Sequence, residues 1–199
     1  MNQETENTKY IDIVKTAHEL FWKHGISRVT IEEVCRKANV SKMTFYKFFS
    51  NKNELGKKVI DDIMDENIQK YREIMNEDIS FEQKVKKQLQ AKFEGTREIS
   101  PELVNDIFSN KKLGLHKYWQ KRANEITVEV MQDYKKAQDE GWIRKDLKIE
   151  FIFYFSNKMS DFLSDPKLLA MYDSMQDLIM EVANLFFYGI FPQKNENNN

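Results

Sequence analysis

The sequence predicts an all-α protein, for three reasons. Six glycines and three prolines in 199 residues leave little material for the tight turns that join strands. Charged residues of both signs make up 32% of the chain, a proportion typical of exposed helix faces. Apolar residues recur at helical spacing along most of the chain, and no window alternates as a strand would. With 41% apolar residues, the chain has enough material for a buried core.

The first predicted helix covers residues 10–24. Ile13, Ala17 and Phe21 repeat at helical spacing on one of its faces. Gly25 follows, and glycine readily adopts the left-handed conformation that ends a helix. The pattern therefore predicts a helix that stops sharply at residue 24.

Two short helices follow, over residues 31–38 and 42–48. Their boundaries carry residues that cap a helix or turn the chain: Thr30 with Glu33, Asn39 and Ser41. Helices this short are not stable alone and must pack on neighbours. Two short helices around a three-residue turn are typical of a helix-turn-helix, here from about Thr30 to Phe49.

Capping signals divide the remainder of the chain into further helices. Their predicted starts carry a capping pair or a proline at the first helical position: Asn51 with Glu54, Ser80 with Gln83, and Ser100 with Pro101. The helix that begins after Asn51 is long and reads as a connector. The longest helical stretch is predicted over residues 116–140, between breaks at Gly114 and Gly141, and Pro166 divides the two apolar segments that follow.

Positive charge is concentrated in one short segment. Residues 36–58 contain seven cations and a single acid, a net charge of +6 on a chain whose total is -1. Such a segment is the footprint of a polyanion site, although runs of charge are more often solvated faces. On charge alone, the two interpretations of this segment weigh about evenly. Burial of Phe45 and Phe48 would turn outward an acid-free face whose lysines and hydroxyls suit the major groove of DNA. The alternative is an ordinary amphipathic helix pair with surface lysines.

This segment closely resembles the DNA-binding domain of the TetR (tetracycline-repressor) family. The matched features are Leu20 and Phe21 with Gly25, Thr30, the run Ala38–Ser41, Thr44, Tyr46, Phe49, and Lys52 with Leu55. Three positions depart from the family's usual residues: Cys35 stands for Ala, Asn39 for Gly, and Phe48 for a frequent His. The resemblance covers about the first quarter of the chain. It implies a sequence-specific regulator of transcription, commonly a repressor, that binds double-stranded operator DNA.

The resemblance also implies which residues meet DNA and how the chain is organised. Residues expected to face DNA are Ser41, Lys42, Met43, Thr44, Tyr46 and Lys47, with Thr30 and Lys52 on the flanking phosphates. We expect a DNA-binding domain over residues 1–52, a helical regulatory and dimerisation domain over 53–192, and a disordered tail over 193–199. Residues 1–8 are also polar and aperiodic, so we expect a mobile start.

One helix-turn-helix covers half of a site, so we expect a homodimer. The candidate interface residues are apolar and lie in the last two helices: Phe151, Phe155, Phe162, Met175, Leu178, Val182 and Phe186. In resembling proteins, the preceding helices enclose a pocket for an effector that releases the operator. Candidate lining residues for a small hydrophobic or aromatic effector are Phe93, Phe108, Trp119, Met131, Tyr134 and Met159. In both sets, the alternative is that these side chains fill the core of their own domain.

Other classes of protein find less support in the sequence. An enzyme would need a convergent chemical site, but there is no phosphate-cradling glycine loop or nucleophile elbow, and the three histidines are scattered at 18, 24 and 116. We expect no metal and no cofactor. One cysteine excludes an internal disulfide, and no signal core or membrane span is found, so we expect a cytoplasmic protein. A helical adaptor controlled by protein partners, with no small-molecule ligand, remains the alternative function.

Overall fold

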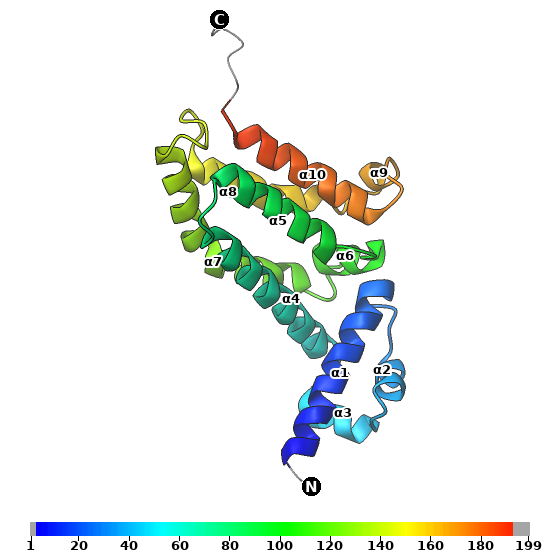
Figure 1. Cartoon of the computed structure of the whole chain (residues 1–199). Helices are drawn as coiled ribbons and strands as arrows, with labels where there is room; N and C mark the ends of the chain where they lie inside the picture. Colours follow the sequence, from blue (N-terminus) through cyan, green and yellow to red (C-terminus); the bar gives the residue numbers. More distant parts are fainter. Residues whose placement is uncertain (1–2, 193–199) are drawn as a thin grey trace, which may run out of the picture. The chain divides into compact units, whose positions relative to one another are not determined.

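Within residues 3–192, which the structure describes, the computed structural model contains ten α-helices and no strand (Figure 1). The helices are α1 (Gln3–His24), α2 (Ile31–Lys37), α3 (Lys42–Phe48), α4 (Lys52–Met75), α5 (Phe81–Gly95), α6 (Pro101–Phe108), α7 (Leu115–Asp139), α8 (Ile149–Phe162), α9 (Pro166–Leu169) and α10 (Met175–Ile190). The all-α prediction is therefore confirmed. The predicted tail, residues 193–199, lies outside the described residues. Among the described helices, none has the length and apolar character needed to cross a bilayer.

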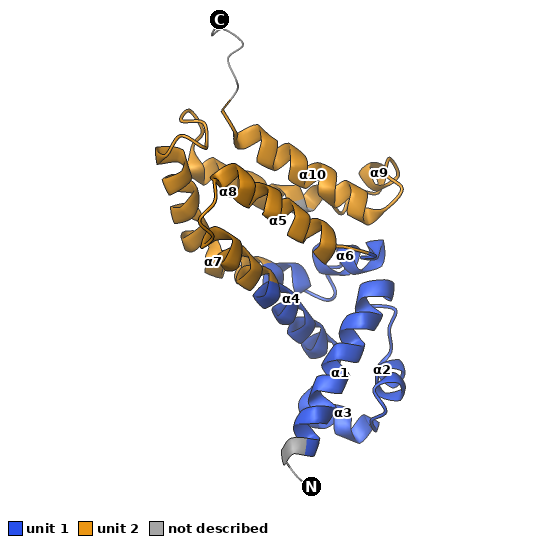
Figure 2. Cartoon of the chain, viewed as in Figure 1, with its two compact units in different colours: residues 1–66, 98–119 blue, residues 67–97, 120–199 orange. Residues whose placement is uncertain are grey.

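The chain forms two compact units (Figure 2). The first contains the described residues up to Glu66 together with Glu98–Trp119, and the second contains Asn67–Arg97 and the described residues from Gln120 onward. Helices α4 and α7 each run from one unit into the other. The unit that holds the helix-turn-helix thus extends beyond residue 52 and includes α6.

The predicted helix caps are present in the structure. Thr30 Oγ1 accepts a hydrogen bond from the Glu33 amide at 3.1 Å, and Ser41 Oγ accepts one from the Thr44 amide at 3.0 Å. Each bond satisfies one amide that a helix N-terminus leaves without an intrahelical partner. Ser80 with Gln83 and Ser100 before Pro101 begin α5 and α6 in the same way. The polar residues between the apolar segments therefore set the helix boundaries.

Helix α1 is longer than the sequence predicts. It begins at Gln3, so the expectation of a mobile start is wrong for residues 3–8. The Tyr10 ring packs against Phe48 and Phe49, with centroid distances of 5.6 and 5.5 Å. The Glu6 carboxylate also lies 3.7 Å from the Lys47 ammonium. These contacts hold the first turns of α1 against α3 and Phe49. The first turns of α1 are thus helical although residues 3–8 have no apolar period of their own.

The core of the first unit lies under the helix-turn-helix. Ile13, Phe21, Val34 and Phe45 are completely buried. Cys35 is also buried, and desolvation raises the pKa of its thiol, which therefore stays protonated and unreactive near neutral pH. Because the side chain at position 35 is packed into the core, a small residue is needed there on α2.

The core of the second unit is formed by α5, α7, α8 and α10. Its buried side chains are Phe81, Val85, Leu89, Tyr134, Ala137, Ile143, Ile149, Ile152, Ala183, Phe187 and Ile190. Tyr134 packs edge-on against Phe81, with 5.9 Å between ring centroids. The helical spacing of apolar residues thus predicted the helix faces that carry these side chains. The structure adds which apolar faces are buried within a single chain.

Candidate DNA-binding surface

The turn between α2 and α3 sets the angle at which α3 leaves the domain. Asn39 has a φ of 53°, in the left-handed region that a tight turn requires and that asparagine tolerates better than most residues. The Val40 amide then donates to the Cys35 carbonyl at 2.9 Å. Ser41 caps α3 immediately afterwards. Short-range hydrogen bonds therefore define the whole turn.

Helix α3 has one buried face and one exposed face. Phe45 is completely buried, whereas Met43 and Tyr46 expose 73% and 55% of their surface. Ser41, Lys42 and Lys47 are also exposed. The structure thus brings the side chains predicted to face DNA onto one surface, except that Thr44 is half-buried. Thr30 is exposed as well, at the start of α2.

Both lysines of this surface have acidic partners on neighbouring helices. The Lys42 ammonium forms an ion pair with Glu32 of α2, and Lys47 lies 3.7 Å from Glu6 of α1. The hydrogen bond to Glu32 raises the pKa of Lys42, and the same bond lowers the pKa of Glu32. The exposed face of α3 is itself free of acids, as its sequence indicates, but its cations are not free of carboxylates. The sequence period did not reveal this pairing, because it joins residues on different helices.

We expect Glu32→Gln to raise the affinity for DNA by about threefold to tenfold at low salt. The change frees Lys42 for phosphate and removes a negative charge next to the surface. Electrophoretic titration of a DNA fragment measures the effect, and it should shrink as salt is added. Glu82→Gln is the matched control, because Glu82 pairs with Lys86 in the second unit. An equal gain in both variants would attribute the effect to net charge alone.

Lys52 lies in a different setting from the lysines of α3. Its ammonium donates to the carbonyl oxygens of Ser27 at 2.9 Å and Val29 at 2.6 Å, in the loop between α1 and α2. Partial burial lowers the pKa of Lys52, and the negative charge of Asp106 acts in the opposite direction. The Lys52 ammonium is therefore already hydrogen-bonded to the protein backbone. The predicted contact of Lys52 with phosphate stays a prediction.

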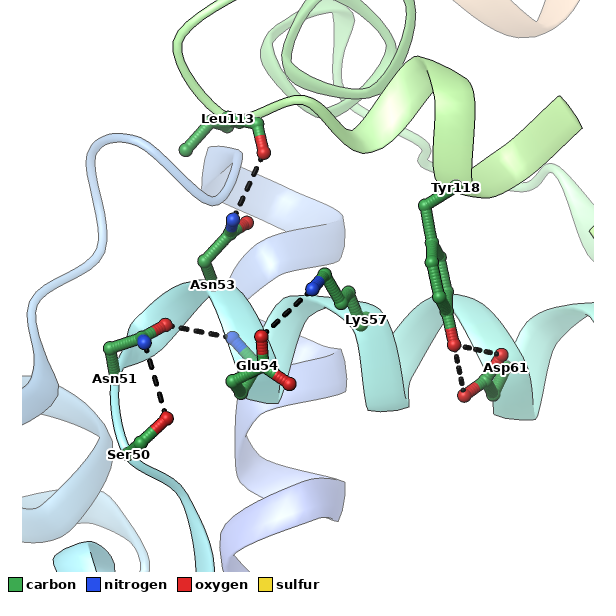
Figure 3. Close-up of polar contacts among 8 residues, drawn as sticks. All are labelled: Ser50, Asn51, Asn53, Glu54, Lys57, Asp61, Leu113 and Tyr118. Atoms are coloured by element: carbon green, nitrogen blue, oxygen red, sulfur yellow. Dashed lines mark hydrogen bonds and ion pairs between the residues drawn. The ribbon is translucent and has the colours of Figure 1, made fainter. Parts of the chain in front are cut away.

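The start of α4 is held by its own cap and by the loop that precedes α7 (Figure 3). Asn51 Oδ1 accepts from the Glu54 amide at 3.0 Å, which begins the helix as the sequence predicts. Asn53 Nδ2 donates to the carbonyl oxygen of Leu113 at 2.9 Å. The first turn of α4, two residues after the helix-turn-helix, is therefore fixed to a loop far along the chain.

About two turns further on, α4 also bonds to the first turn of α7. The Tyr118 hydroxyl donates to the Asp61 carboxylate, with distances of 2.9 and 2.8 Å to its two oxygens (Figure 3). Lys57 pairs with Glu54 at 2.8 Å and lies 5.6 Å from the centre of the Tyr118 ring. These polar contacts lie within the first compact unit. They tie the connector helix to both segments that follow α6.

The six residues proposed to line an effector pocket are divided between the two units. Phe108 and Trp119 belong to the first unit, where their rings meet edge-on at 5.4 Å. In the second unit, Tyr134 is buried in the core, Phe93 is 49% exposed, and Met131 and Met159 are half-buried. Met131 also lines an open groove of about 1100 Å³, together with residues that include Val128, Lys135, Gln138, Leu147 and Ile149. Their role in binding an effector stays a prediction.

The predicted dimer interface needs correction at two positions. Met175 and Leu178 are only 3% and 2% exposed, because they pack inside their own chain. Phe151, Phe155 and Phe162 are exposed, and Val182 and Phe186 are half-buried. Three exposed apolar residues escaped the prediction: Tyr154 on α8, and Leu185 and Tyr188 on α10. Leu185 and Tyr188 lie three residues apart on α10, and this helical spacing is the sequence signal that could have identified them.

Among the described residues, no group of histidine, cysteine, aspartate and glutamate side chains is arranged to hold a metal ion.

The first unit has the structural features of a helix-turn-helix whose second helix is exposed on one face, and comparison with known proteins agrees. Residues 13–59 match the family model described as "Bacterial regulatory proteins, tetR family". This match spans α1, the helix-turn-helix and the start of α4.

A curated relative and solved structures extend the comparison to most of the chain. The HTH-type transcriptional regulator YhgD of Bacillus subtilis (strain 168) is 28% identical over 134 residues, which cover 66% of this chain and 70% of YhgD. A TetR-family transcriptional regulator from Rhodococcus sp. superposes with a TM-score of 0.68 at 16% identity, covering 94% of this chain and 100% of the other. FadR from Bacillus subtilis, solved in complex with stearoyl-CoA, gives a TM-score of 0.65 at 16% identity, covering 91% and 99%. Residues 13–59 therefore form a DNA-binding domain of the tetR family of bacterial regulatory proteins, and the whole chain is similar in fold to regulators of transcription.

Proposed function

We propose that the protein binds operator DNA as a homodimer and represses transcription until a small hydrophobic or aromatic molecule releases it. Residues 1–52 would read DNA, and residues 53–192 would dimerise and bind the effector. The observation that carries the proposal is the exposed face of α3, with Lys42, Met43, Tyr46 and Lys47 turned away from the buried Phe45. A short helix with a cationic and hydroxyl-bearing face suits the major groove.

The side chains of this face divide naturally between two tasks. Lys42 and Lys47 carry the positive charge that neutralises phosphate, which positions a protein on DNA without reading sequence. Tyr46 and Met43 offer a hydroxyl and apolar surface to base edges and to the methyl group of thymine. Thr30 would add a phosphate contact at the start of α2. The lysines would therefore supply most of the affinity, and the two neighbouring side chains the choice of sequence.

A homodimer is proposed because α8 and α10 each expose large apolar side chains. These side chains, which we call the α8–α10 patch, are Phe151, Tyr154, Phe155, Phe162, Leu185 and Tyr188. Exposed aromatic side chains such as Phe151 and Phe155, which stack on α8, are typical of interaction sites in proteins. A second copy that covers the patch would supply the second reading helix, about 34 Å away along the DNA.

The effector is proposed to be hydrophobic on two grounds. The candidate lining residues are aromatic or methionine side chains, which adapt to apolar ligands. FadR from Bacillus subtilis, which shares the fold, is solved with stearoyl-CoA, a ligand with a long apolar chain. An effector that binds the DNA-incompetent conformation more tightly would release the operator.

An electrophoretic mobility shift with the DNA upstream of the protein's own gene tests DNA binding. We expect retardation that survives excess unrelated DNA at moderate salt, and no retardation would contradict the proposal. Light scattering tests the dimer, with an expected mass about twice the 23.8 kDa of one chain. Addition of long-chain acyl-CoA and of small aromatic compounds to the preformed complex tests the effector. DNA binding that none of these compounds affects would favour control by a protein partner.

A further inference from the structure

The loop between α1 and α2 is held from two sides by charged side chains that lie outside α3. On one side is Asp106 of α6, a carboxylate that is only 3% exposed. On the other side is the ammonium of Lys52 at the start of α4. Ser27 lies between them. We call this arrangement the Ser27 clasp.

The Asp106 carboxylate binds both the backbone and the side chain of Ser27. One oxygen accepts from the Ser27 amide at 2.7 Å, and the other accepts from the Ser27 hydroxyl at 2.5 Å. Asn110 Nδ2 donates to the second oxygen at 3.1 Å and to Ser27 Oγ at 3.0 Å. Hydrogen bonds to an ionised acceptor are stronger than neutral ones. A buried carboxylate with three donors therefore fixes this point of the loop firmly.

Lys52 completes the clasp by binding the carbonyl groups of the same loop. It donates to the Ser27 carbonyl at 2.9 Å and to the Val29 carbonyl at 2.6 Å. Ser27 thus donates to Asp106 through its amide and accepts from Lys52 through its carbonyl. The negative charge of Asp106 also favours the charged form of Lys52 across the loop.

The loop also approaches α6 more closely than a side chain would allow. Gly25 has a φ of +74°, and a Cβ atom there would lie 2.8 Å from Glu102 Cβ and 2.9 Å from Asp106 Oδ2. Ile26 and Val29, on either side of Ser27, are completely buried. Glycine at this position is therefore required both by its conformation and by its neighbours.

From this geometry we propose that Asp106 and Lys52 are positioning residues for DNA binding, acting through Ser27. The clasped loop ends at Thr30, whose side chain caps α2, and α2 leads through a three-residue turn into α3. A loop released from the clasp would hold α2 and α3 in the DNA-competent orientation for a smaller fraction of the time. Affinity falls in proportion to that fraction. The inference rests on the proposed DNA binding and assigns Lys52 a role other than contact with phosphate.

Asp106→Asn is the central variant, because simple electrostatics and the clasp predict opposite results for it. Removal of a negative charge should strengthen DNA binding slightly, whereas loss of the clasp should weaken it by about tenfold. Glu102→Gln is the matched control, since it removes one exposed carboxylate from the same helix. We expect the control to stay within about twofold of the unmodified protein.

The salt dependence of binding separates positioning from phosphate contact. Lys52→Gln should lower affinity without changing the slope of log K against log salt, because no counterion release is lost. Lys42→Ala, a change at a proposed phosphate contact, should lower the slope by about 1 per contact. A comparable decrease in slope for Lys52→Gln would overturn its assignment as a positioning residue.

Hydrogen exchange measured without DNA tests the clasp independently of DNA binding. We expect the Ser27 amide to exchange at least about tenfold faster in Asp106→Asn than in Glu102→Gln. If circular dichroism shows that Asp106→Asn is unfolded, Ser27→Ala is the milder variant, because it keeps the hydrogen bond from the backbone amide of residue 27 to Asp106. We expect Ser27→Ala to weaken DNA binding by about threefold. Unchanged affinity in folded clasp variants would overturn the inference. Failure of the unmodified protein to bind DNA would instead overturn the proposed function.

Discussion

Simultaneous replacement of Lys42 and Lys47 by alanine is expected to lower operator affinity by about a thousandfold at physiological salt. Each phosphate contact releases about 0.9 of a counterion, which contributes about 0.7 log units of affinity at 0.15 M salt. A homodimer presents each lysine twice, so the double variant loses four such contacts. The slope of log K against log salt should fall by between about 3 and 4 at the same time. A titration of operator binding at several salt concentrations measures both quantities.

A matched control separates the surface of α3 from net charge. Lys86 and Lys135 are exposed lysines of the second unit, and each pairs with an acid one turn away. Their double replacement by alanine removes the same charge, and we expect operator affinity to stay within about threefold. Equal losses in the two double variants would show that binding follows net charge. No loss in the Lys42 and Lys47 variant would show that another surface meets DNA.

The local features of the helix-turn-helix were predictable because they depend on near neighbours in sequence. Thr30 and Ser41 bond to amides three residues ahead, and the left-handed turn at Asn39 needs only a tolerant residue. The same holds for the stop at Gly25. Capping chemistry therefore placed both short helices within a residue of their observed ends. The period of apolar residues alone would have left their boundaries open.

Contacts between distant parts of the chain were not predictable in this way. Ser27 and Asp106 are 79 positions apart, and nothing in the period of α6 distinguishes a buried aspartate from an exposed one. The partners of Lys42 and Lys47 lie on α2 and α1 for the same reason. A charged residue in a sequence does not say which carboxylate folding will bring beside it. The site's surface was thus predictable, but its electrostatic surroundings were not.

Apolar periodicity likewise identifies a face and does not say what covers that face. On α10, Leu178 is buried by its own chain, whereas Leu185 and Tyr188 are exposed. All three are apolar residues on one helix, and only tertiary packing separates them. The interface prediction failed at Met175 and Leu178 for this reason. The exposed members of the α8–α10 patch are the ones whose burial in a dimer can be tested.

Replacement of Phe151 and Phe155 by glutamate is expected to separate the proposed dimer into monomers. Their rings stack at 6.0 Å on the exposed side of α8. By symmetry, a dimer that buries this patch would bury four new carboxylates, each at a cost of several kcal/mol. Light scattering at micromolar concentration should then give 23.8 kDa. Because both side chains are exposed in the single chain, its helical content by circular dichroism should change little.

The same variant links dimerisation to DNA binding. A monomer presents one reading helix, which covers half of a site, so we expect operator affinity to fall by at least about a hundredfold while weak binding to unrelated DNA remains. Met171 and Val128 are exposed apolar residues outside the patch, each more exposed than Phe151 or Phe155, and their double replacement by glutamate is the control. It should leave both mass and affinity unchanged. A Phe151 and Phe155 variant that stays dimeric would place the interface elsewhere, whereas a monomer with full operator affinity would contradict the mechanism in which two heads are needed to hold one operator.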